Sequence, residues 1–247
     1  MSTIDLNADL GEGGAFDLAL LDVVSSCNIA CGGHAGDAAS MRATVRAAMA
    51  RRVALGAHPA YPDRDGFGRQ SRFLSGAKLR QSLAGQMDSL VSIVASAGGV
   101  LAQAKPHGAL YADAARDTEL AELFVDAVQH CIAGAAIVGP PGSALQRAAE
   151  RAGGVFVGEA FVDRAYLPSG ELVPRSEPGA VHADFNTMTA QAVSLATQGV
   201  VTAQDGSVIT IAAATLCIHG DTPAAAAAAR AVRDVLQANG VEVRAAV

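Results

Sequence analysis

Histidine side chains follow several short apolar segments of this sequence, at positions where they could transfer protons, bind anions or hold a metal ion. The histidines in this pattern are His34, His58, His107 and His219. Lys105 stands two residues before one of them, and Lys78 is the only other lysine in a chain that otherwise uses arginine. His130 and His182 lie outside the pattern, so we interpret them as packing or surface residues.

Carboxylates, an amide and an arginine accompany these histidines. In the string at 5–12, Asn7 and Asp9 would share one face of an extended strand, and Glu12 follows shortly after. Asp163 and Arg164 come directly after another apolar segment. If those segments are strands that end at one edge, all of these groups can meet in one pocket.

Seven short runs of apolar or β-branched residues are typical of buried strands. They lie at 4–6, 28–30, 53–56, 100–104, 135–138, 155–157 and 215–218. Helical patterns separate them, which indicates parallel strands joined by right-handed crossovers, in a barrel or a doubly wound sheet. In both folds the loops after the strands converge on one mouth, where ligands bind.

Polar residues mark the starts of several predicted helices. These starts are Asp37, Ser75, Asp117 and the Asp-Thr-Pro sequence at 221–223, whose helix should end near Ala238. For Asp37 and Asp221 a role as a ligand stays open beside helix capping. Two segments break the alternation and are predicted insertions: 164–184, with many turn-forming residues, and 200–211, a hairpin.

The composition excludes several classes of protein. Apolar residues make up 51% of the 247 residues and charged residues 17%, so the chain can bury a sizeable core and is not disordered. A net charge of −6 disfavours nucleic acid and anionic membranes as partners. No membrane span or signal peptide is evident, so we expect one cytoplasmic domain over residues 1–247. The four cysteines lack a zinc-binding spacing and are expected to be reduced.

Six strings, taken together and in order, resemble the LamB/YcsF family. They lie at 5–12, 28–37, 56–69, 105–111, 159–180 and 217–221, and run through nearly the full chain. Gly33 and Ala60 depart from the family pattern, where an aromatic residue and a glycine are usual, which affects the shape of the pocket wall more than the reaction. The resemblance implies an α/β fold, a distorted seven-stranded (β/α) barrel similar to the glycoside hydrolase/deacetylase barrel.

The resemblance also implies an activity, that of the A subunit of an ATP-dependent 5-oxoprolinase. Such an enzyme cleaves the lactam of 5-oxo-L-proline to L-glutamate while ATP is hydrolysed to ADP and phosphate. The implied partners are subunits B and C, and ATP would arrive with Mg²⁺. The sequence has neither GxxxxGK[ST] nor a GxGxxG after a strand, so a nucleotide would have to approach glycine turns such as 11–14 or 32–36. Those glycines are explained equally well by tight turns.

The implied reaction needs a cation for developing negative charge and a base for water. Lys105 is the candidate for contact with a phosphate or oxyanion. Asp9 is the first candidate for general base or ligand of a metal-bound water, with Glu12 and Asp163 as alternates. Substrate or nucleotide is expected to contact Asn7, His34, His58, Tyr61, His107, Arg164 and His219. Candidate ligands for a divalent metal are Asp9, His34, His58, His107 and His219.

Other functions stay open beside this one. The barrel and its histidines also suit a metal-dependent amidase or deacetylase without ATP, and a non-catalytic subunit could position the substrate for its partners. Three arginines could clamp a carboxylate or phosphate, or pair with glutamates at the surface. The arginines are Arg69, Arg164 and Arg175, and the glutamates are Glu159, Glu171 and Glu177. The segment 164–184 is the predicted partner surface.

Overall fold

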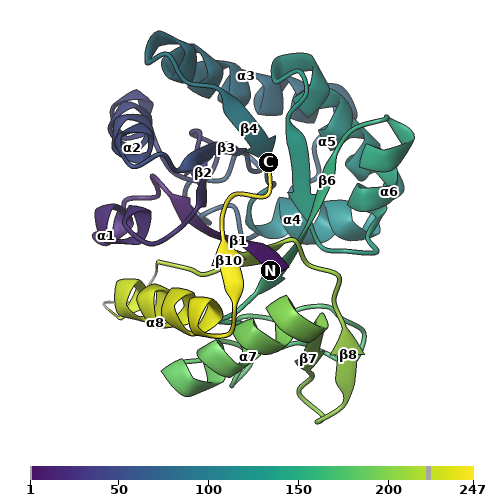
Figure 1. Ribbon diagram of the computed structural model, residues 1–247. Coiled ribbons are helices and arrows are strands. Elements are labelled where there is room, and N and C mark those ends of the chain that lie inside the picture. The colour runs from purple at the N-terminus through teal and green to yellow at the C-terminus, as the bar shows by residue number, and fades with distance from the viewer. Residues whose placement is uncertain (1, 221–223) are drawn as a thin grey trace.

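Seven parallel strands form a barrel that closes on itself (Figure 1). The structure, a computed structural model, describes residues 2–220 and 224–247. In barrel order the strands are β1 (Ser2–Leu10), β2 (Ser26–Ala30), β3 (Ala54–His58), β4 (Leu101–Ala104), β5 (Ala136–Gly139), β6 (Phe156–Phe161) and β9 (Thr215–Cys217). β9 pairs with both β6 and β1, which closes the barrel. The predicted seven-stranded barrel is confirmed.

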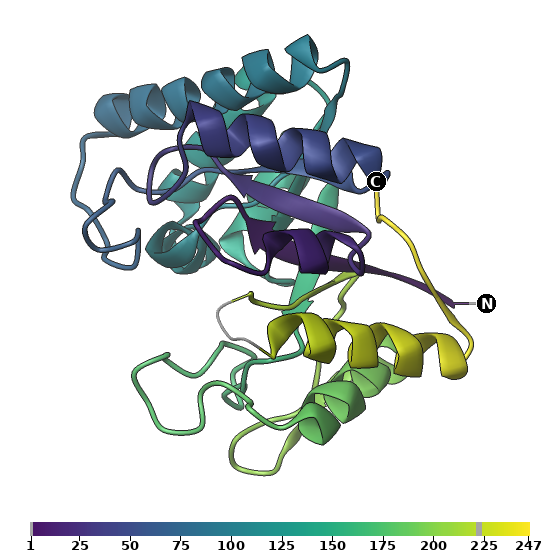
Figure 2. The ribbon, with the colours of Figure 1, turned by 90° about the vertical axis from the view of Figure 1, so that its left-hand side faces the viewer.

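One further strand lies outside the predicted set. β10 (Val241–Val243) pairs in parallel with the first residues of β1, Ser2 to Ile4. The later residues of β1 pair with β2 and β9 instead. β10 therefore extends the sheet beside the start of β1, at the end of the barrel where both chain termini lie (Figure 2).

Hydrogen bonds between polar side chains cross the interior of this barrel. In many other barrels, branched apolar residues fill the interior. β1 continues beyond its predicted end, so its alternate residues Asp5, Asn7 and Asp9 share the inner face. The Asn7 amide donates to Glu159 Oε1 at 3.0 Å and to Thr215 Oγ1 at 2.8 Å. Because β1 and β6 are not neighbours, the bond to Glu159 must cross the interior.

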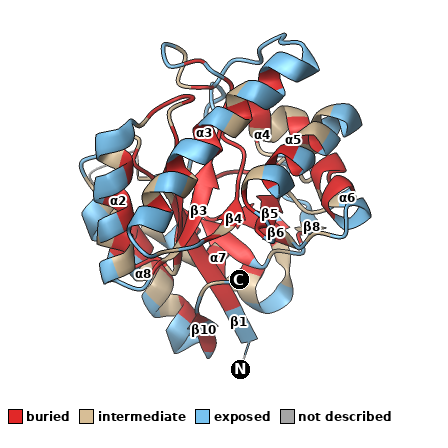
Figure 3. Cartoon of the chain, turned by 90° about the horizontal axis from the view of Figure 1, so that it is seen from above, coloured by how far each residue is buried: buried red, intermediate tan, exposed pale blue. Residues whose placement is uncertain are grey.

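Helices surround the barrel and expose their outer faces to solvent (Figure 3). They are α1 (Asp17–Leu21), α2 (Ala38–Ala50), α3 (Gly76–Ser96), α4 (Gly108–Arg116), α5 (Thr118–Cys131), α6 (Ala144–Arg151), α7 (Phe185–Gln198) and α8 (Ala225–Ala238). Among the helices of residues 2–220 and 224–247, none has the length and apolar character needed to cross a membrane.

The helix starts agree with the polar residues identified in the sequence. Asp37 accepts hydrogen bonds from two backbone N–H groups of α2, and Asp117 does the same for α5. Ser75 precedes α3, as predicted, without a capping bond from its side chain. The predicted cap at 221–223 lies outside the described residues, and α8 ends at Ala238, as predicted.

Two insertions occur where the sequence predicts them. Residues 164–184 form turns held by isolated bridges, one of which joins Arg164 and Val181. β7 (Val200–Thr202) and β8 (Val208–Thr210) form an antiparallel hairpin apart from the barrel sheet. Figure 2 shows the long connections after β3 and β6 at the end of the molecule away from both termini.

A close approach of two backbones fixes the start of α4. Gly108 directly follows His107 and has a left-handed conformation, with φ at +56°. A Cβ added to Gly108 would lie 2.5 Å from the carbonyl oxygen of Gly68. We expect Gly108→Ala to lower the free energy of unfolding by about 1–3 kcal/mol, because it adds both strain and a clash. Urea unfolding followed by circular dichroism measures this change.

Gly85 offers the matched control inside α3. In the part of the chain that the structure describes, no atom lies within 4 Å of a Cβ added there. Gly85→Ala should raise the free energy of unfolding by about 0.5–1 kcal/mol, because alanine favours a helix. Equal stability of the Gly108→Ala variant and the wild type would contradict the tight approach between Gly108 and Gly68.

Candidate active site

A pocket of about 470 Å³ opens at the carboxyl ends of the barrel strands. This volume is in the range of sites that bind small molecules. Seven of the predicted site residues line it: Asp9, Glu12, His58, Lys105, His107, Arg164 and His219. They come from β1, β3 and the loops that follow β1, β4, β6 and β9, so the barrel brings together residues that are far apart in the sequence.

Lys105 is buried in this pocket with its ammonium group fully engaged. Nζ lies 2.8 Å from Glu159 Oε1, 3.0 Å from Asp9 Oδ1 and 3.3 Å from Cys217 Sγ. Burial acts to lower the pKa of Lys105, but the negative charges beside it, above all that of Asp9, hold the pKa well above its usual value. Burial also raises the pKa of the Cys217 thiol. Lys105 is therefore a charged ammonium group near neutral pH, and the thiol is its weakest partner.

Asp9 links Lys105 to His58. Its Oδ2 lies 3.3 Å from His58 Nε2, and its Oδ1 accepts a hydrogen bond from the Asn28 amide at 3.0 Å. Burial alone would raise the pKa of Asp9, but the charges of His58 and Lys105 hold it well below its usual range. Asp9 is therefore an ionised carboxylate in a fixed position.

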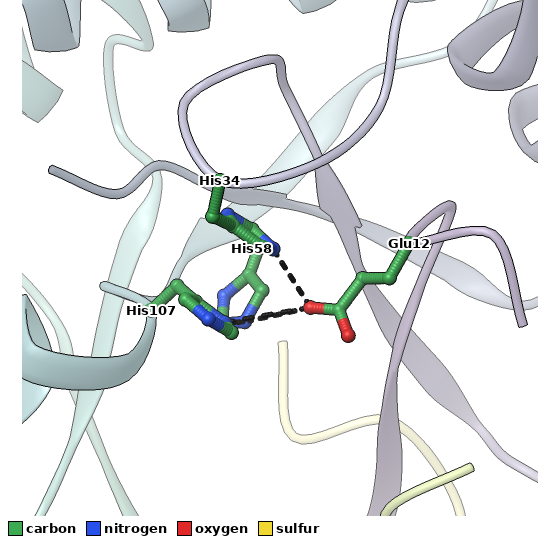
Figure 4. Close-up of side chains that lie close together, drawn as sticks. All are labelled: Glu12, His34, His58 and His107. Carbon is green, nitrogen blue, oxygen red and sulfur yellow. Dashed lines mark hydrogen bonds and ion pairs between the residues drawn. The ribbon is translucent and has the colours of Figure 1, made fainter. Parts of the chain in front are cut away.

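Three histidines and a glutamate meet at one wall of the pocket, and we call them the three-histidine cluster (Glu12, His34, His58 and His107; Figure 4). Glu12 Oε1 lies 2.8 Å from His34 Nε2 and 3.4 Å from His107 Nδ1. The rings of His34 and His107 stack, with their centroids 3.5 Å apart. Burial, together with the charge of His58, lowers the pKa of His34 and of His107 to about 3, so both rings are neutral near neutral pH.

Asp163 and His219 form a separate pair, of which His219 lines the pocket and Asp163 lies behind it. Asp163 Oδ2 lies 2.8 Å from His219 Nδ1 and also accepts the backbone N–H of His219 at 3.1 Å. The ring of His219 stacks on Phe161. Burial opposes the ionisation of Asp163, but His219 keeps the pKa of this carboxyl below its usual value. The pairing orients the imidazole and leaves Nε2 as the nitrogen that can meet a substrate.

Arg164 lines the pocket, but its guanidinium group is used within the chain. It donates to the backbone carbonyl oxygens of Val173 at 2.6 Å and Ala180 at 3.1 Å. Both acceptors lie in the insertion 164–184. Arg164 therefore orders this segment, and the geometry gives it a structural role at the edge of the pocket.

Glu159 is a site residue that the sequence analysis does not identify. The expectation that it pairs with an arginine at the surface is wrong, because its side chain is fully buried and contacts Lys105. β6 continues to Phe161, past its predicted end, so Glu159 belongs to a strand and faces the interior. A glutamate two residues inside an otherwise apolar strand was the available signal.

Three predicted ligand contacts, Asn7, His34 and Tyr61, are not among the described residues that line the pocket. Tyr61 is buried and donates its hydroxyl to Asp113 at 3.0 Å, while Asn7 bonds to Glu159 inside the barrel. The geometry therefore supports a positioning role for Tyr61 and Asn7, through Asp113 and Glu159, in place of direct contact with a ligand.

Two of the glycine N–H groups that could have approached a phosphate are engaged within the chain. The N–H of Gly11 donates to Asp17 Oδ2 at 2.8 Å, and the N–H of Gly32 donates to the carbonyl oxygen of Ala35 at 2.8 Å. These backbone donors are already engaged. The tight-turn explanation is therefore favoured at Gly11 and Gly32.

A barrel mouth that holds a buried lysine, carboxylates and oriented histidines defines a class of protein: an α/β barrel with an acid–base site for a small molecule. The sequence profile of the LamB/YcsF family matches residues 4–247, and the chain belongs to this family. It is 48% identical over 248 residues to a protein of Methylococcus capsulatus (strain Bath) that is named as the A subunit of 5-oxoprolinase. The alignment covers 98% of this chain and 95% of that relative.

Solved structures have the same fold. The lactam utilization protein from Thermus thermophilus is 43% identical, with a TM-score of 0.91, over 98% of this chain and 99% of that chain. A family 4 carbohydrate esterase from Streptomyces lividans has a TM-score of 0.50 at 14% identity, over 98% of this chain and 91% of that chain. The likeness to the esterase shows the barrel fold alone.

Proposed function

We propose that this chain opens the lactam ring of 5-oxo-L-proline to give L-glutamate, as the A subunit of an ATP-dependent 5-oxoprolinase with subunits B and C. The observation that carries the proposal is the pocket, in which Lys105, Asp9 and His219 face one space. The relatives, one named as a 5-oxoprolinase component and the other as a lactam utilization protein, support a lactam as the substrate.

ATP provides the activation that a stable five-membered amide needs. The γ-phosphoryl group passes from ATP to the lactam carbonyl oxygen, ADP leaves, and the ring carbon becomes open to water. Water adds to this carbon, the ring C–N bond breaks, and the released amine takes up a proton. A second water hydrolyses the resulting acyl phosphate to glutamate and phosphate. Mg²⁺ accompanies ATP and offsets the charge of its phosphates.

The residues of the pocket match the needs of ring opening. Lys105 exchanges its weak contact with Cys217 for the carbonyl oxygen of the substrate and the phosphoryl group that this oxygen receives, where negative charge accumulates. His219, oriented by Asp163, moves a proton between the attacking water and the ring nitrogen. Asp9 holds Lys105 charged and in place.

Arg69 is our candidate for binding the carboxylate of 5-oxoproline. It lines the pocket, and its guanidinium carbon lies over the ring of Phe67, 5.0 Å from the centroid. Arginine can bind a carboxylate through two parallel hydrogen bonds. We expect Arg69→Ala to raise KM for 5-oxoproline by about 10- to 100-fold with little change in kcat. The reason is that Arg69 would bind the carboxylate equally tightly in the ground state and in the transition state.

Steady-state kinetics of the assembled enzyme measure both constants. Arg46→Ala, on the exposed face of α2, is the matched control and should leave KM unchanged. A fall in kcat at unchanged KM would contradict the binding role of Arg69.

An amidase that works without ATP is the second candidate function, and the three-histidine cluster is the observation that favours it. Histidine and carboxylate ligands are the donors that zinc uses in hydrolases. A non-catalytic subunit that positions the substrate is the third candidate. The assay described next separates all three.

Release of glutamate from 5-oxo-L-proline tests the proposal. The chain is assayed alone and together with subunits B and C, in each case with and without ATP and Mg²⁺. We expect release only from the complete mixture with ATP. Release by the chain alone without ATP would establish the amidase instead, and full activity of a complex carrying Lys105→Met would identify a carrier.

The rim of the pocket is our proposed contact surface for subunits B and C. Phe73, in the connection after β3, has a fully exposed side chain, and Val181, in the insertion 164–184, is 44% exposed. Exposed apolar side chains that border a functional pocket are typical of interaction surfaces. On this proposal the partners would lie beside the mouth of the pocket, from where they could deliver an activated substrate.

A further inference from the structure

Four side chains of the three-histidine cluster direct one ligand-type atom each at a common point (Figure 4). These atoms, one from each side chain, all lie within 4.8 Å of one another. His58 ends β3, and the other three side chains follow β1, β2 and β4. The barrel therefore builds the cluster from four separate strand ends, as it builds the rest of the pocket.

Backbone carbonyls fix the hydrogen positions on two of the rings. His58 Nδ1 lies 2.8 Å from the carbonyl oxygen of Lys105, and His107 Nε2 lies 3.0 Å from that of Phe67. A carbonyl oxygen only accepts, so each of these nitrogens carries a hydrogen. The remaining nitrogens, His58 Nε2 and His107 Nδ1, face one another at 3.0 Å. These two nitrogens, with Glu12 Oε1 beside them, converge on one point at which a cation can be held.

This is the arrangement in which proteins hold histidines that bind metal ions. Such a histidine donates one N–H to a carbonyl or carboxylate and offers the other nitrogen to the ion. A histidine binds a metal ion through the lone pair of a ring nitrogen that carries no hydrogen. His34 has a buried Nδ1 that finds no hydrogen-bond partner within residues 2–220 and 224–247, so its contact with Glu12 is the polar contact that positions the ring.

The distances suit a small transition-metal ion. Tetrahedral coordination with bonds of about 2.0–2.1 Å places neighbouring ligand atoms roughly 3.3 Å apart. The separations of Glu12 Oε1 from the nitrogens of His34, His107 and His58 are 2.8, 3.4 and 3.8 Å. Three imidazoles and one carboxylate favour zinc and similar ions over Mg²⁺ and Ca²⁺, which prefer oxygen ligands.

We infer that the three-histidine cluster binds one divalent transition-metal ion of the zinc type at the wall of the pocket. The inference goes beyond the proposed function, because it concerns the chain's own ligands whichever amide is the substrate. When bound, an ion of this kind supplies Lewis acidity beside the reacting carbonyl group.

A second group of metal-ligand residues, Asp9, Cys217 and His219, lies nearby and is already occupied by a cation. The ammonium group of Lys105 contacts both Asp9 and Cys217, at 3.0 and 3.3 Å. A metal ion at this position would have to displace a buried lysine charge. The inference is therefore confined to the three-histidine cluster.

Cobalt binding tests the inference without any activity assay. The full chain, prepared without a polyhistidine tag and stripped with a chelator, is titrated with Co²⁺ and followed by visible absorption. We expect one Co²⁺ per chain with the intense bands of tetrahedral cobalt, and stoichiometric displacement by Zn²⁺. Zn²⁺ should also raise the Tm of the wild type, because it binds the folded state alone.

Variants identify the ligands. Glu12→Gln, a nearly isosteric change that should preserve the fold, and His107→Ala should each lower the affinity for Co²⁺ at least about 100-fold. His130→Ala, on the exposed face of α5, and His219→Ala, from the second group, should bind Co²⁺ like the wild type. Circular dichroism verifies that each variant is folded.

Three results would overturn the inference. The first is an absence of saturable Co²⁺ binding by the wild type. That result would mean that a proton on His58 Nε2, in place of a metal ion, lies between this nitrogen and His107 Nδ1. The second is a loss of the ion in His219→Ala while His107→Ala retains it. The third is unchanged affinity in a folded Glu12→Gln variant. Each of these readouts is independent of glutamate release, so the metal site and the proposed 5-oxoprolinase activity can fail separately.

Discussion

Replacing Lys105 by methionine should lower kcat/KM of the assembled 5-oxoprolinase about a thousandfold, the loss expected when a single donor to the developing negative charge of a reaction is removed from a buried site. Methionine keeps the length and most of the apolar stem of the side chain while it removes the charge. The lost ammonium group contacts Asp9 and Glu159 and lines the pocket. Steady-state release of glutamate measures the effect.

The same substitution should also destabilise the fold, which has to be separated from the loss of catalysis. Without Lys105, the buried carboxylate of Glu159 loses its cation and that of Asp9 keeps only its contact with His58, at a cost of about 3–5 kcal/mol. Adding Glu159→Gln to Lys105→Met removes one of these charges and should recover part of the stability but none of the activity.

Lys78→Met is the control for this experiment, because Lys78 is the only other lysine and is exposed on α3. It should have wild-type stability and kinetics. If the folded double variant retained a tenth or more of the wild-type activity, Lys105 would have no catalytic role and the substrate oxygen would have to bind elsewhere.

The contacts of Lys105 illustrate what the sequence could predict and what it could not. The alternation of apolar runs and helical patterns predicts seven parallel strands, and parallel strands predict that residues at their carboxyl ends share a mouth. Lys105 and His107 could be placed at this mouth in that way. Their partners could not be identified, because contacts across a barrel depend on strand register and tilt, which local patterns do not encode.

Glu159 and β10 show two further physical limits. The sequence predicts that β6 ends at 157, yet the pairing with β9 continues through Phe161 and turns Glu159 inward. Only the tertiary pairing decides where that strand stops. β10 is three residues long and comes from the opposite end of the chain to its partner, the start of β1. Such a short strand has no recognisable local pattern, because only its long-range pairing defines it.

Asp163→Asn is the second substitution with a large expected effect, and it tests how His219 is used. The carboxylate accepts from His219 Nδ1 at 2.8 Å and so holds the hydrogen on that nitrogen, which leaves Nε2 to accept a proton from water. Asparagine can present its amide N–H to Nδ1 and favour the opposite tautomer. We expect kcat to fall by about 10²- to 10⁴-fold at nearly constant KM, the usual range for loss of general acid–base catalysis.

A double-mutant cycle distinguishes this role from a structural one. If Asp163 acts through the imidazole, the Asp163→Asn/His219→Ala variant should be no slower than His219→Ala alone, because the two residues work as one unit. Asp234→Asn, on the exposed face of α8, is the matched control and should behave like the wild type. Two results would mean that Asp163 only supports the fold. One is a loss of kcat in the double variant equal to the product of the two single losses, and the other is a fall in Tm that parallels the fall in kcat. The proton transfer would then have to be reassigned to a different group of the pocket.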